Sequence, residues 1–380
     1  MSSQPKIVDL FSGCGGFGLG AKLAGFNVVV AVDIDETLQS AYKRNFPNTN
    51  VVNGDLSKLD GNDWKLLLAG QEIDGVIGGP PCQGYSRMGK GDVNDPRRSL
   101  LRYFFNTVNI ISPKFFVMEN VEGLLDEKNS DELYGAIKLA DPKYVVLDPF
   151  IVDASKYGAP TKRKRVVVIG YDPKRISSIE AREILSIGKM SVTVKDAIYD
   201  LSEPISQDKD ADNFGWSKYR AIKKVSDYAL KMRSLPPSGL GWNDAIDYLK
   251  KGKCSGNYDT KHLPEISERY GSIIPGQTDP VSRSKRLSWN GLCPTLRAGT
   301  GADKGSHQAV RPIHPSKSRV ITVREAARLQ GFPDWFCFHN TKWHSFRMIG
   351  NSVSPFVSES ILGVIHKKLS SKQVTQKEAA

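Results

Sequence analysis

Four short motifs contain side chains that could do chemistry, and the first is built around a cysteine. Residues 78–83 read Gly-Gly-Pro-Pro-Cys-Gln, so the Cys82 thiol follows two stiff prolines. An ordinary thiol has a pKa of about 8.5 and needs nearby positive charge to act as a nucleophile. Residues 83–98 carry four basic side chains and three glycines, which predicts a mobile, positively charged loop beside Cys82. A buried, inert cysteine is the alternative.

The second and third motifs supply acidic and basic groups. Glu119 and Asn120 close an apolar run at 116–118. Poor solvation there would favour the protonated carboxyl and allow it to donate a proton near neutral pH. Arg163 and Arg165 alternate in an extended stretch, so one face could present two guanidinium groups to a phosphate or a base oxygen. The alternative for Glu119 is a helix cap or a salt-bridged strand end. The alternative for Arg163 and Arg165 is a solvated basic strand.

The fourth motif is a glycine-rich turn at 9–20, Asp-Leu-Phe-Ser-Gly-Cys-Gly-Gly-Phe-Gly-Leu-Gly. Glycines let a strand-to-helix turn approach a ligand closely, and an acid about 20 residues on commonly holds a ribose hydroxyl. Asp33 ends the next apolar run and fits that position. NAD, FAD and S-adenosylmethionine all suit such a site, whereas the chain has no Walker phosphate loop for ATP or GTP. A plain tight turn is the alternative.

Alternating apolar runs and amphipathic stretches must position these motifs. The runs predict strands near 7–11, 28–32, 51–52, 75–79, 115–118, 144–149 and 166–170, with helices at 37–45 and 100–111. This alternation favours an α/β fold with a mostly parallel sheet. Residues 173–317 are less regular and predict a second, smaller domain. Helices return at 322–330, with a capping box from Thr322 and Glu325, and at 355–368, before a disordered tail at 370–380.

Composition narrows the class of partner. The 380 residues carry 53 Lys and Arg against 41 Asp and Glu, a net charge of +12, and residues 216–290 alone carry net +7. This surplus favours a polyanion. The five cysteines are widely spaced, which is untypical of a zinc or disulfide framework. The sequence shows no signal peptide and no apolar run long enough to span a membrane, so we expect a cytoplasmic protein.

Taken together, the motifs resemble those of the cytosine carbon-5 DNA methyltransferases. The order of glycine loop, Pro-Pro-Cys-Gln, Glu-Asn-Val and Arg-x-Arg is similar, and the resemblance continues at 324–333, at 350–353 and at Cys-Pro-Thr-Leu, 293–296. It covers about 1–172 and 286–368. Two positions depart from the family pattern. Thr161 stands where the family usually has Gln, and Ile34 follows Asp33 where the family often has an aromatic residue.

The resemblance implies a Rossmann-like S-adenosylmethionine-dependent methyltransferase fold with a target-recognition domain. The catalytic domain would comprise 1–172 and 318–380, and the recognition domain 173–317. The implied activity is methyl transfer from S-adenosylmethionine, without a metal, to carbon 5 of a flipped cytosine in a specific duplex DNA sequence. We expect a monomer that acts alone or is paired with a restriction endonuclease for the same site.

The resemblance also implies roles for individual residues. Cys82 would add to carbon 6 of cytosine, and Glu119 would hold N3 and the exocyclic amine. Arg165 would contact O2, Arg163 would lie near the thiolate or a phosphate, and Asn120 would orient the segment around Cys82. The implied cofactor contacts, in which Ile34 and Leu56 sandwich the adenine, are Phe11, Gly13, Gly15, Gly16, Asp33, Ile34, Asp55, Leu56, Pro81, Leu100, Asn351 and Val353. Further substrate contacts would be Gln83, Ser86, Arg87, Arg97 and Thr295.

Three other functions are compatible with parts of this pattern. A tRNA cytosine methyltransferase of the same fold usually carries a Cys-Phe-Thr tripeptide, which the chain lacks. A catalytically inactive DNA-binding protein is disfavoured by the intact Cys82, Glu119 and Arg165. A Rossmann oxidoreductase that uses Cys82 for redox chemistry would need a resolving cysteine, and none is near in the sequence.

Overall fold

The structure is a computed structural model that describes residues 4–81, 99–207, 213–298 and 311–378. Its centre is an eight-stranded sheet in the order β3-β2-β1-β4-β5-β8-β6, with β7 also paired to β8. Strands β1 to β5 are parallel to their neighbours, whereas β8 is antiparallel to β5, β6 and β7. The sheet strands are β1 (Lys6–Leu10), β2 (Asn27–Asp33), β3 (Asn50–Asn53), β4 (Gly75–Gly78), β5 (Phe115–Val121), β6 (Val145–Val146), β7 (Phe150–Asp153) and β8 (Lys164–Tyr171).

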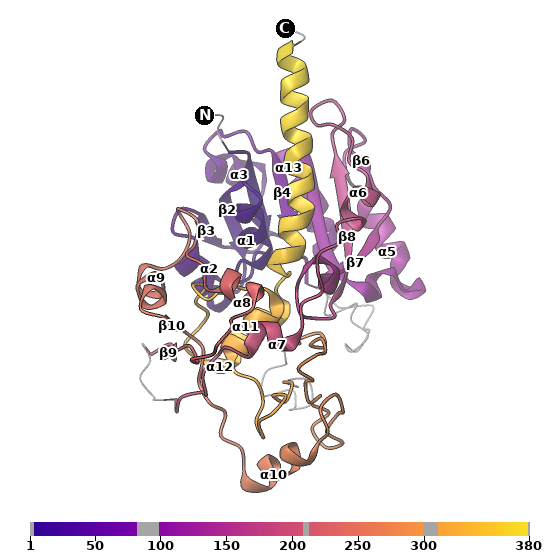
Figure 1. Ribbon diagram of the computed structural model, residues 1–380. Coiled ribbons are helices and arrows are strands. Elements are labelled where there is room, and N and C mark those ends of the chain that lie inside the picture. The colour runs from indigo at the N-terminus through magenta and orange to yellow at the C-terminus, as the bar shows by residue number, and fades with distance from the viewer. Residues whose placement is uncertain (1–3, 82–98, 208–212, 299–310, 379–380) are drawn as a thin grey trace.

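The central strands are apolar because helices cover both faces of the sheet. Successive side chains point to opposite faces, so Ile7 joins one core and Val8 the other. Helices α3 (Gly61–Leu68), α4 (Leu100–Ile111) and α5 (Glu127–Ile137) contribute to the core that contains Val8. Helices α1 (Gly16–Leu23), α2 (Glu36–Asn45) and α13 (Pro355–Glu378) contribute to the other. In Figure 1, α13 runs beside α1 although the two are far apart in sequence.

The region after β8 is built from short elements. These are α6 (Ala181–Leu185), α7 (Val194–Ile198), β9 (Ser217–Lys218), α8 (Asp227–Met232), α9 (Asn243–Lys250), β10 (Lys253–Cys254) and α10 (Pro264–Ser272). Only β9 and β10 pair, as a two-stranded sheet among the residues described. Short 3-10 turns η2 (Glu122–Leu125) and η3 (Ala154–Tyr157) follow β5 and β7. The division into two domains at 173 and 317 stays a prediction.

A buried charge network ties this region to helix α11 (Val323–Gln330). The Arg328 guanidinium donates to both carboxylate oxygens of Asp334, at 2.8 and 2.6 Å, and to Asp200 Oδ1 at 2.5 Å. The Tyr219 hydroxyl also donates to Asp334, at 2.7 Å. Removal of one partner from a buried ion pair strongly destabilises a protein. The network therefore fixes the position of the short elements relative to α11. The predicted capping box of Thr322 and Glu325 is confirmed.

The α/β fold and the mostly parallel sheet are confirmed, but some elements differ from the predictions. Of the run predicted at 144–149 only Val145–Val146 form a strand, β6, and β7 begins after Pro149, which lacks the N–H that a continuous ladder needs. Helices α3 and α5 were not predicted. Helix α13 continues to Glu378, past the helix end predicted at 368, and the disordered tail at 370–380 stays a prediction. No proline or glycine after Gly363 interrupts that helix.

One stretch, Lys342–Lys372, is long and apolar enough to cross a membrane by length and composition. It comprises α12 (Lys342–Asn351) and most of α13. In this structure 78% of its apolar window is buried inside the protein, which is typical of a core helix.

Candidate active site

The candidate site has two parts, and the glycine-rich turn after β1 forms the first. Phe11, Gly13 and Gly15 have φ angles of 52°, 52° and 97°, in the left-handed region that favours glycine. The Gly13 N–H donates to Asp33 Oδ2 at 2.8 Å, which joins the end of β1 to the end of β2. A Cβ placed on Gly13 would meet nothing within 4 Å among the described atoms. The turn therefore leaves open space directly above its backbone, next to a carboxylate.

Ile34 and Leu56, the two apolar residues predicted to contact the adenine, differ in solvent exposure. Ile34 is 68% exposed, which is unusual for a large apolar side chain, whereas Leu56 is only 5% exposed and belongs to the core. The sandwich of adenine between Ile34 and Leu56 stays a prediction, in which Leu56 could offer only a small part of its side chain. Asp55 accepts from the Ser57 amide and hydroxyl, at 3.0 and 2.7 Å. These hydrogen bonds lower the pKa of Asp55 and keep it an acceptor.

The C-terminal segment folds back against the glycine turn, as predicted. A Cβ on Gly16 would lie 2.4 Å from the Val353 carbonyl, so only glycine permits this approach. The Cys14 Sγ lies 3.1 Å from Ser352 Oγ and donates to the Met348 carbonyl at 3.6 Å. These contacts bring exposed Asn351, at the end of α12, and buried Val353 to the edge of the turn.

The carboxyl ends of β4 and β5 form the other half of the site. The Asn120 side-chain amide donates to the Pro80 carbonyl at 3.2 Å and its Oδ1 accepts from the Val121 N–H at 2.8 Å. Asn120 therefore fixes the backbone two residues before Cys82. Pro81 is the last described residue before that position, and Leu100 begins α4 directly after Ser99, where the described chain resumes.

Glu119 and Arg165 lie together at this edge. Glu119 is 8% exposed, and its Oε1 is 3.0 Å from the Arg165 Nε. The approach does not have hydrogen-bond geometry, so Oε1 has no hydrogen-bond partner among the described residues. Gly79 leaves the carboxylate accessible, since a Cβ there would stand 3.6 Å from Glu119 Oε2. The pair thus presents a carboxylate acceptor and a guanidinium donor side by side.

Arg163 is not placed at a DNA phosphate, one of the two positions predicted for it, and its place relative to Cys82 stays a prediction because Cys82 lies outside the described residues. Its side chain is 3% exposed, and its guanidinium donates to the carbonyls of Leu296, Gly350 and Ser352 at 3.3, 3.0 and 2.8 Å. A guanidinium buried among carbonyls cannot reach a DNA phosphate. Arg163 and Arg165 therefore do not share a ligand-facing surface, and the position of Arg163 supports a role in joining the strand to the C-terminal segment.

The two motif segments around Thr161 and Thr295 are hydrogen-bonded to each other. Buried Thr161 donates to the Cys293 carbonyl at 3.2 Å, and Thr295 donates to the Lys162 carbonyl at 2.7 Å. The Lys162 N–H donates to Cys293 at 2.8 Å. The short Thr161 side chain thus makes a hydrogen bond between the two segments at a position where the resemblance predicts the longer Gln.

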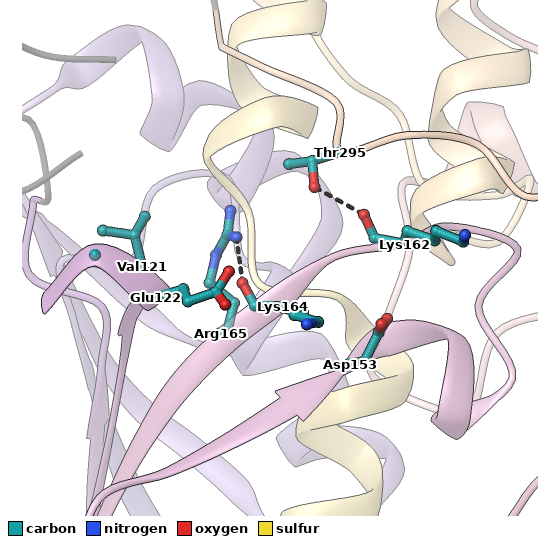
Figure 2. A pocket seen from close by; sticks show the side chains of 8 residues that line it. Val121, Glu122, Asp153, Lys162, Lys164, Arg165 and Thr295 are labelled. Carbon is teal, nitrogen blue, oxygen red and sulfur yellow. Dashed lines mark hydrogen bonds between the residues drawn. The ribbon is translucent and has the colours of Figure 1, made fainter. Parts of the chain in front are cut away.

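Two polar pockets meet along this pairing. The first, with a volume of about 490 Å³, is seen in Figure 2, where Lys164 and Arg165 come from the start of β8, Lys162 precedes that strand and Thr295 lies opposite. The second, of about 450 Å³, also contains Lys162 and Thr295 and extends to Lys285. The three lysines are exposed. The two pockets, here called the basic groove, contain the basic side chains of Lys162, Lys164, Arg165 and Lys285, and the carboxylates of Glu122 and Asp153 also line the first.

The described cysteines cannot serve as nucleophiles. Cys14, Cys254, Cys293 and Cys337 are buried free thiols, and burial raises the pKa of each, to about 12 for Cys14 and Cys254. A buried thiol is inert. The remaining cysteine of the chain, Cys82, lies outside the described residues, as do Gln83, Ser86, Arg87 and Arg97.

Several residues at the site were not found from the sequence. Ser352 and Gln330 fix the C-terminal segment, and the Gln330 amide donates to the Ser352 carbonyl at 3.0 Å. Asp35 and Arg347 pair beside Asp33. The sequence signals Asp35 as an N-cap, since it stands just before a predicted helix. It does not signal the pairing with Arg347, because the two residues are 312 positions apart. Among the residues described, no group of His, Cys, Asp or Glu could hold a metal ion.

Comparison with known proteins identifies the family. Residues 5–367 match C-5 cytosine-specific DNA methylases. The chain belongs to this family. It is 38% identical to the type II methyltransferase M.XorII of Xanthomonas oryzae pv. oryzae, over 97% of this chain and 86% of that protein. It is 32% identical to M.DdeI of Desulfomicrobium norvegicum, over 94% and 87% of the two chains.

Comparison with solved structures supports the same family assignment. A crystal structure from E. coli, described as a DNA modification methyltransferase encoded within a prophage, has 42% identity and a TM-score of 0.85, and covers 96% of this chain and 99% of that chain. Dnmt2 of S. pombe, with 15% identity, a TM-score of 0.58 and 97% and 99% coverage, shows the same fold alone. This chain is a DNA cytosine-5 methyltransferase, and its similarity to type II enzymes is consistent with a restriction-modification role.

Proposed function

We propose that this methyltransferase acts on a cytosine that is flipped out of duplex DNA and held covalently by Cys82 during the reaction. The observation that supports this most strongly is the Glu119–Arg165 pair beside the Asn120-anchored backbone that leads to Cys82. Stacked bases in a duplex shield the ring faces, so an enzyme that attacks the ring must extrude the base.

The chemistry requires a thiolate because carbon 5 of cytosine is a poor nucleophile. Addition of the Cys82 sulfur to carbon 6 forms an S–C bond and moves the ring electrons towards N3 and carbon 5. The Glu119 carboxyl would hold N3 and the exocyclic amine, and Arg165 would hold O2, as charge develops on the ring. After methylation, loss of the carbon-5 proton and departure of the thiolate would restore the aromatic ring.

The glycine turn fits S-adenosylmethionine, the methyl donor that the family implies. When bound, this cofactor supplies an electrophilic methyl group on a sulfonium sulfur. Gly13 offers open space and Asp33 a carboxylate that can accept from ribose hydroxyls. Exposed Ile34 offers an apolar face to the adenine, and Asp55 an acceptor for its amine. Asn351 lies at the edge of the same turn. The other cofactor contacts remain those proposed from the resemblance.

The basic groove is proposed to hold the DNA backbone beside the extruded base. Lys162, Lys164 and Lys285 line it from the catalytic strand and from the 276–295 region. Phosphate contacts from lysine position a protein on DNA but carry no sequence information. Base reading is then left to side chains in the 173–317 region. We also propose that the enzyme is a cytoplasmic monomer and that a restriction endonuclease recognises the same site.

Bisulfite sequencing of DNA from cells that express the chain tests the proposal. Protection of cytosines within one recurring sequence would support it, and the protected positions would define the target site. An unmethylated genome, despite a folded protein that binds S-adenosylmethionine, would contradict it. Methylation of tRNA but not of duplex DNA by the purified protein would contradict the choice of substrate.

A further inference from the structure

We propose that Arg347 is a positioning residue for the cofactor and acts through Asp35 on the ribose-binding carboxylate Asp33. This inference rests on the assignment of the glycine turn and Asp33 to S-adenosylmethionine. Arg347 lies on α12, more than 300 residues after Asp33, and no sequence motif connected the two. Its guanidinium Nη2 lies 2.5 Å from Asp35 Oδ2.

Asp35 is held at both oxygens. Its Oδ1 accepts from the Leu38 N–H at 3.1 Å and caps the first turn of α2, while Oδ2 receives Arg347. An exposed ion pair usually contributes little because two flexible side chains must be ordered to form it. Here the cap has already ordered Asp35, and the two side chains are only 29% and 22% exposed. The pair is therefore expected to be stronger than a surface pair.

A continuous chain of contacts leads from Arg347 to the glycine turn. The Asp35 N–H donates to Asp33 Oδ1 at 2.8 Å, and Asp33 Oδ2 accepts from the Gly13 N–H at 2.8 Å. Each Asp33 oxygen keeps a lone pair for a ribose hydroxyl. Displacement of Asp35 would move the N–H that orients Asp33. The positive charge of Arg347 also opposes the rise in the Asp33 pKa that burial causes.

The same helix carries a proposed cofactor contact at its end. Arg347 and Asn351 are four residues apart on α12 and share one face. The end of α12 is independently anchored, because Arg163 donates to the Gly350 carbonyl at 3.0 Å. The Arg347–Asp35 pair thus joins the middle of α12 to the β2–α2 turn, so that the two walls of the cofactor site keep a fixed separation.

Calorimetric titration of the full chain with S-adenosylmethionine, without DNA, tests the inference. Arg347→Ala should weaken binding about tenfold, as expected for loss of a partly buried ion pair. The KM for S-adenosylmethionine should rise by a similar factor, while kcat at saturating cofactor should change less than twofold. Arg347→Lys should recover most of the affinity, because it keeps the charge. A purely structural role would not produce this split between KM and kcat.

A double-mutant cycle and a control make the test decisive. Asp35→Asn keeps an oxygen for the α2 cap but loses the charge, so it should match Arg347→Ala, and the double variant should be no weaker than either single variant. Arg182→Ala, which removes an exposed ion pair with Glu180, should bind as the unaltered chain does. Additive losses, or unchanged affinity in Arg347→Ala, would overturn the inference. If Arg347→Ala does not fold, unchanged affinity in Asp35→Asn would overturn it.

The titration distinguishes failure of this inference from failure of the proposed function. Failure of the unaltered chain to bind S-adenosylmethionine would remove the cofactor assignment, and the inference with it. Normal binding by the unaltered chain together with normal binding by both single variants would overturn only the role of Arg347.

Discussion

The Nε atom of Arg165 lies 3.0 Å from Oε1 of Glu119, across the paired ends of β8 and β5. This places a guanidinium donor and a carboxylate side by side at the edge of the sheet. The pair is nearly buried, so its electrostatic interactions are stronger than they would be in water. Arg165 also compensates the charge of the Glu119 carboxylate.

Glu119→Gln should reduce kcat by about 10²–10³-fold, because the amide cannot supply the charge or the proton that the ring requires. Binding of duplex DNA, measured by fluorescence anisotropy, should change less than threefold. Glu127→Gln, an exposed glutamate in the first turn of α5, is the matched control and should retain full activity. Comparable activity in the two variants would contradict the role of Glu119.

Arg163 and Arg165 should respond differently to substitution by alanine. Arg163→Ala removes a donor from three buried carbonyls, of which the Ser352 carbonyl keeps only the Gln330 amide, and should lower the free energy of unfolding by about 3 kcal/mol. Arg165→Ala removes a single partner at the rim of a pocket and should mainly lower turnover. Urea denaturation followed by circular dichroism measures the first effect and labelled methyl transfer the second. Equal stability of the two variants would argue against the joining role of Arg163.

DNA affinity should fall steeply as salt concentration rises. If Lys285 contacts a phosphate across the groove, Lys285→Ala should weaken binding to all sequences alike and reduce the slope of log K against log salt by about 1. Lys250→Ala, an exposed lysine on α9 paired with Asp247, serves as the comparison and should leave the slope unchanged if the groove is the DNA path. A slope that Lys285→Ala does not alter would remove Lys285 from the interface.

Asp9 should make the protein less stable as pH rises. Burial raises the pKa of Asp9 to about 8, from 3.8, although the Tyr42 hydroxyl donates to it at 3.1 Å. Between these values the folded chain holds a proton that the unfolded chain has lost, so the contribution of Asp9 to stability declines across this window. Asp9→Asn cannot ionise. Its free energy of unfolding relative to the unaltered chain should therefore increase from pH 5 to pH 9, and a constant difference would contradict the assignment.

The elements that carry the site could be predicted because their signals are local. Apolar runs indicated the strands, and the Thr322 and Glu325 spacing indicated the start of α11 correctly. Glu119 and Arg165 could be placed at strand ends for the same reason. The glycines of the turn were also recognisable, since Gly16 must admit the Val353 carbonyl and only glycine does so.

The remaining features depend on contacts between distant segments. Arg163 was expected near the thiolate or a phosphate, and the sequence does not reveal that three carbonyls of 296–352 surround it. Leu56 was expected at the adenine, and the sequence does not reveal that most of its side chain packs into the core. The pairing of Asp35 with Arg347 and the burial of Arg328 likewise arise only when the C-terminal helices return to the sheet.

The covalent step can be tested directly with duplex DNA that carries 5-fluorocytosine at the target position. Because fluorine cannot leave as the carbon-5 proton does, the enzyme and S-adenosylmethionine should form a stable adduct, and mass spectrometry should locate it on the peptide that contains Cys82. Cys82→Ser should bind the duplex but form no adduct. Methylation of the ordinary duplex without an adduct on the fluorinated one, or an adduct on another residue, would contradict the account.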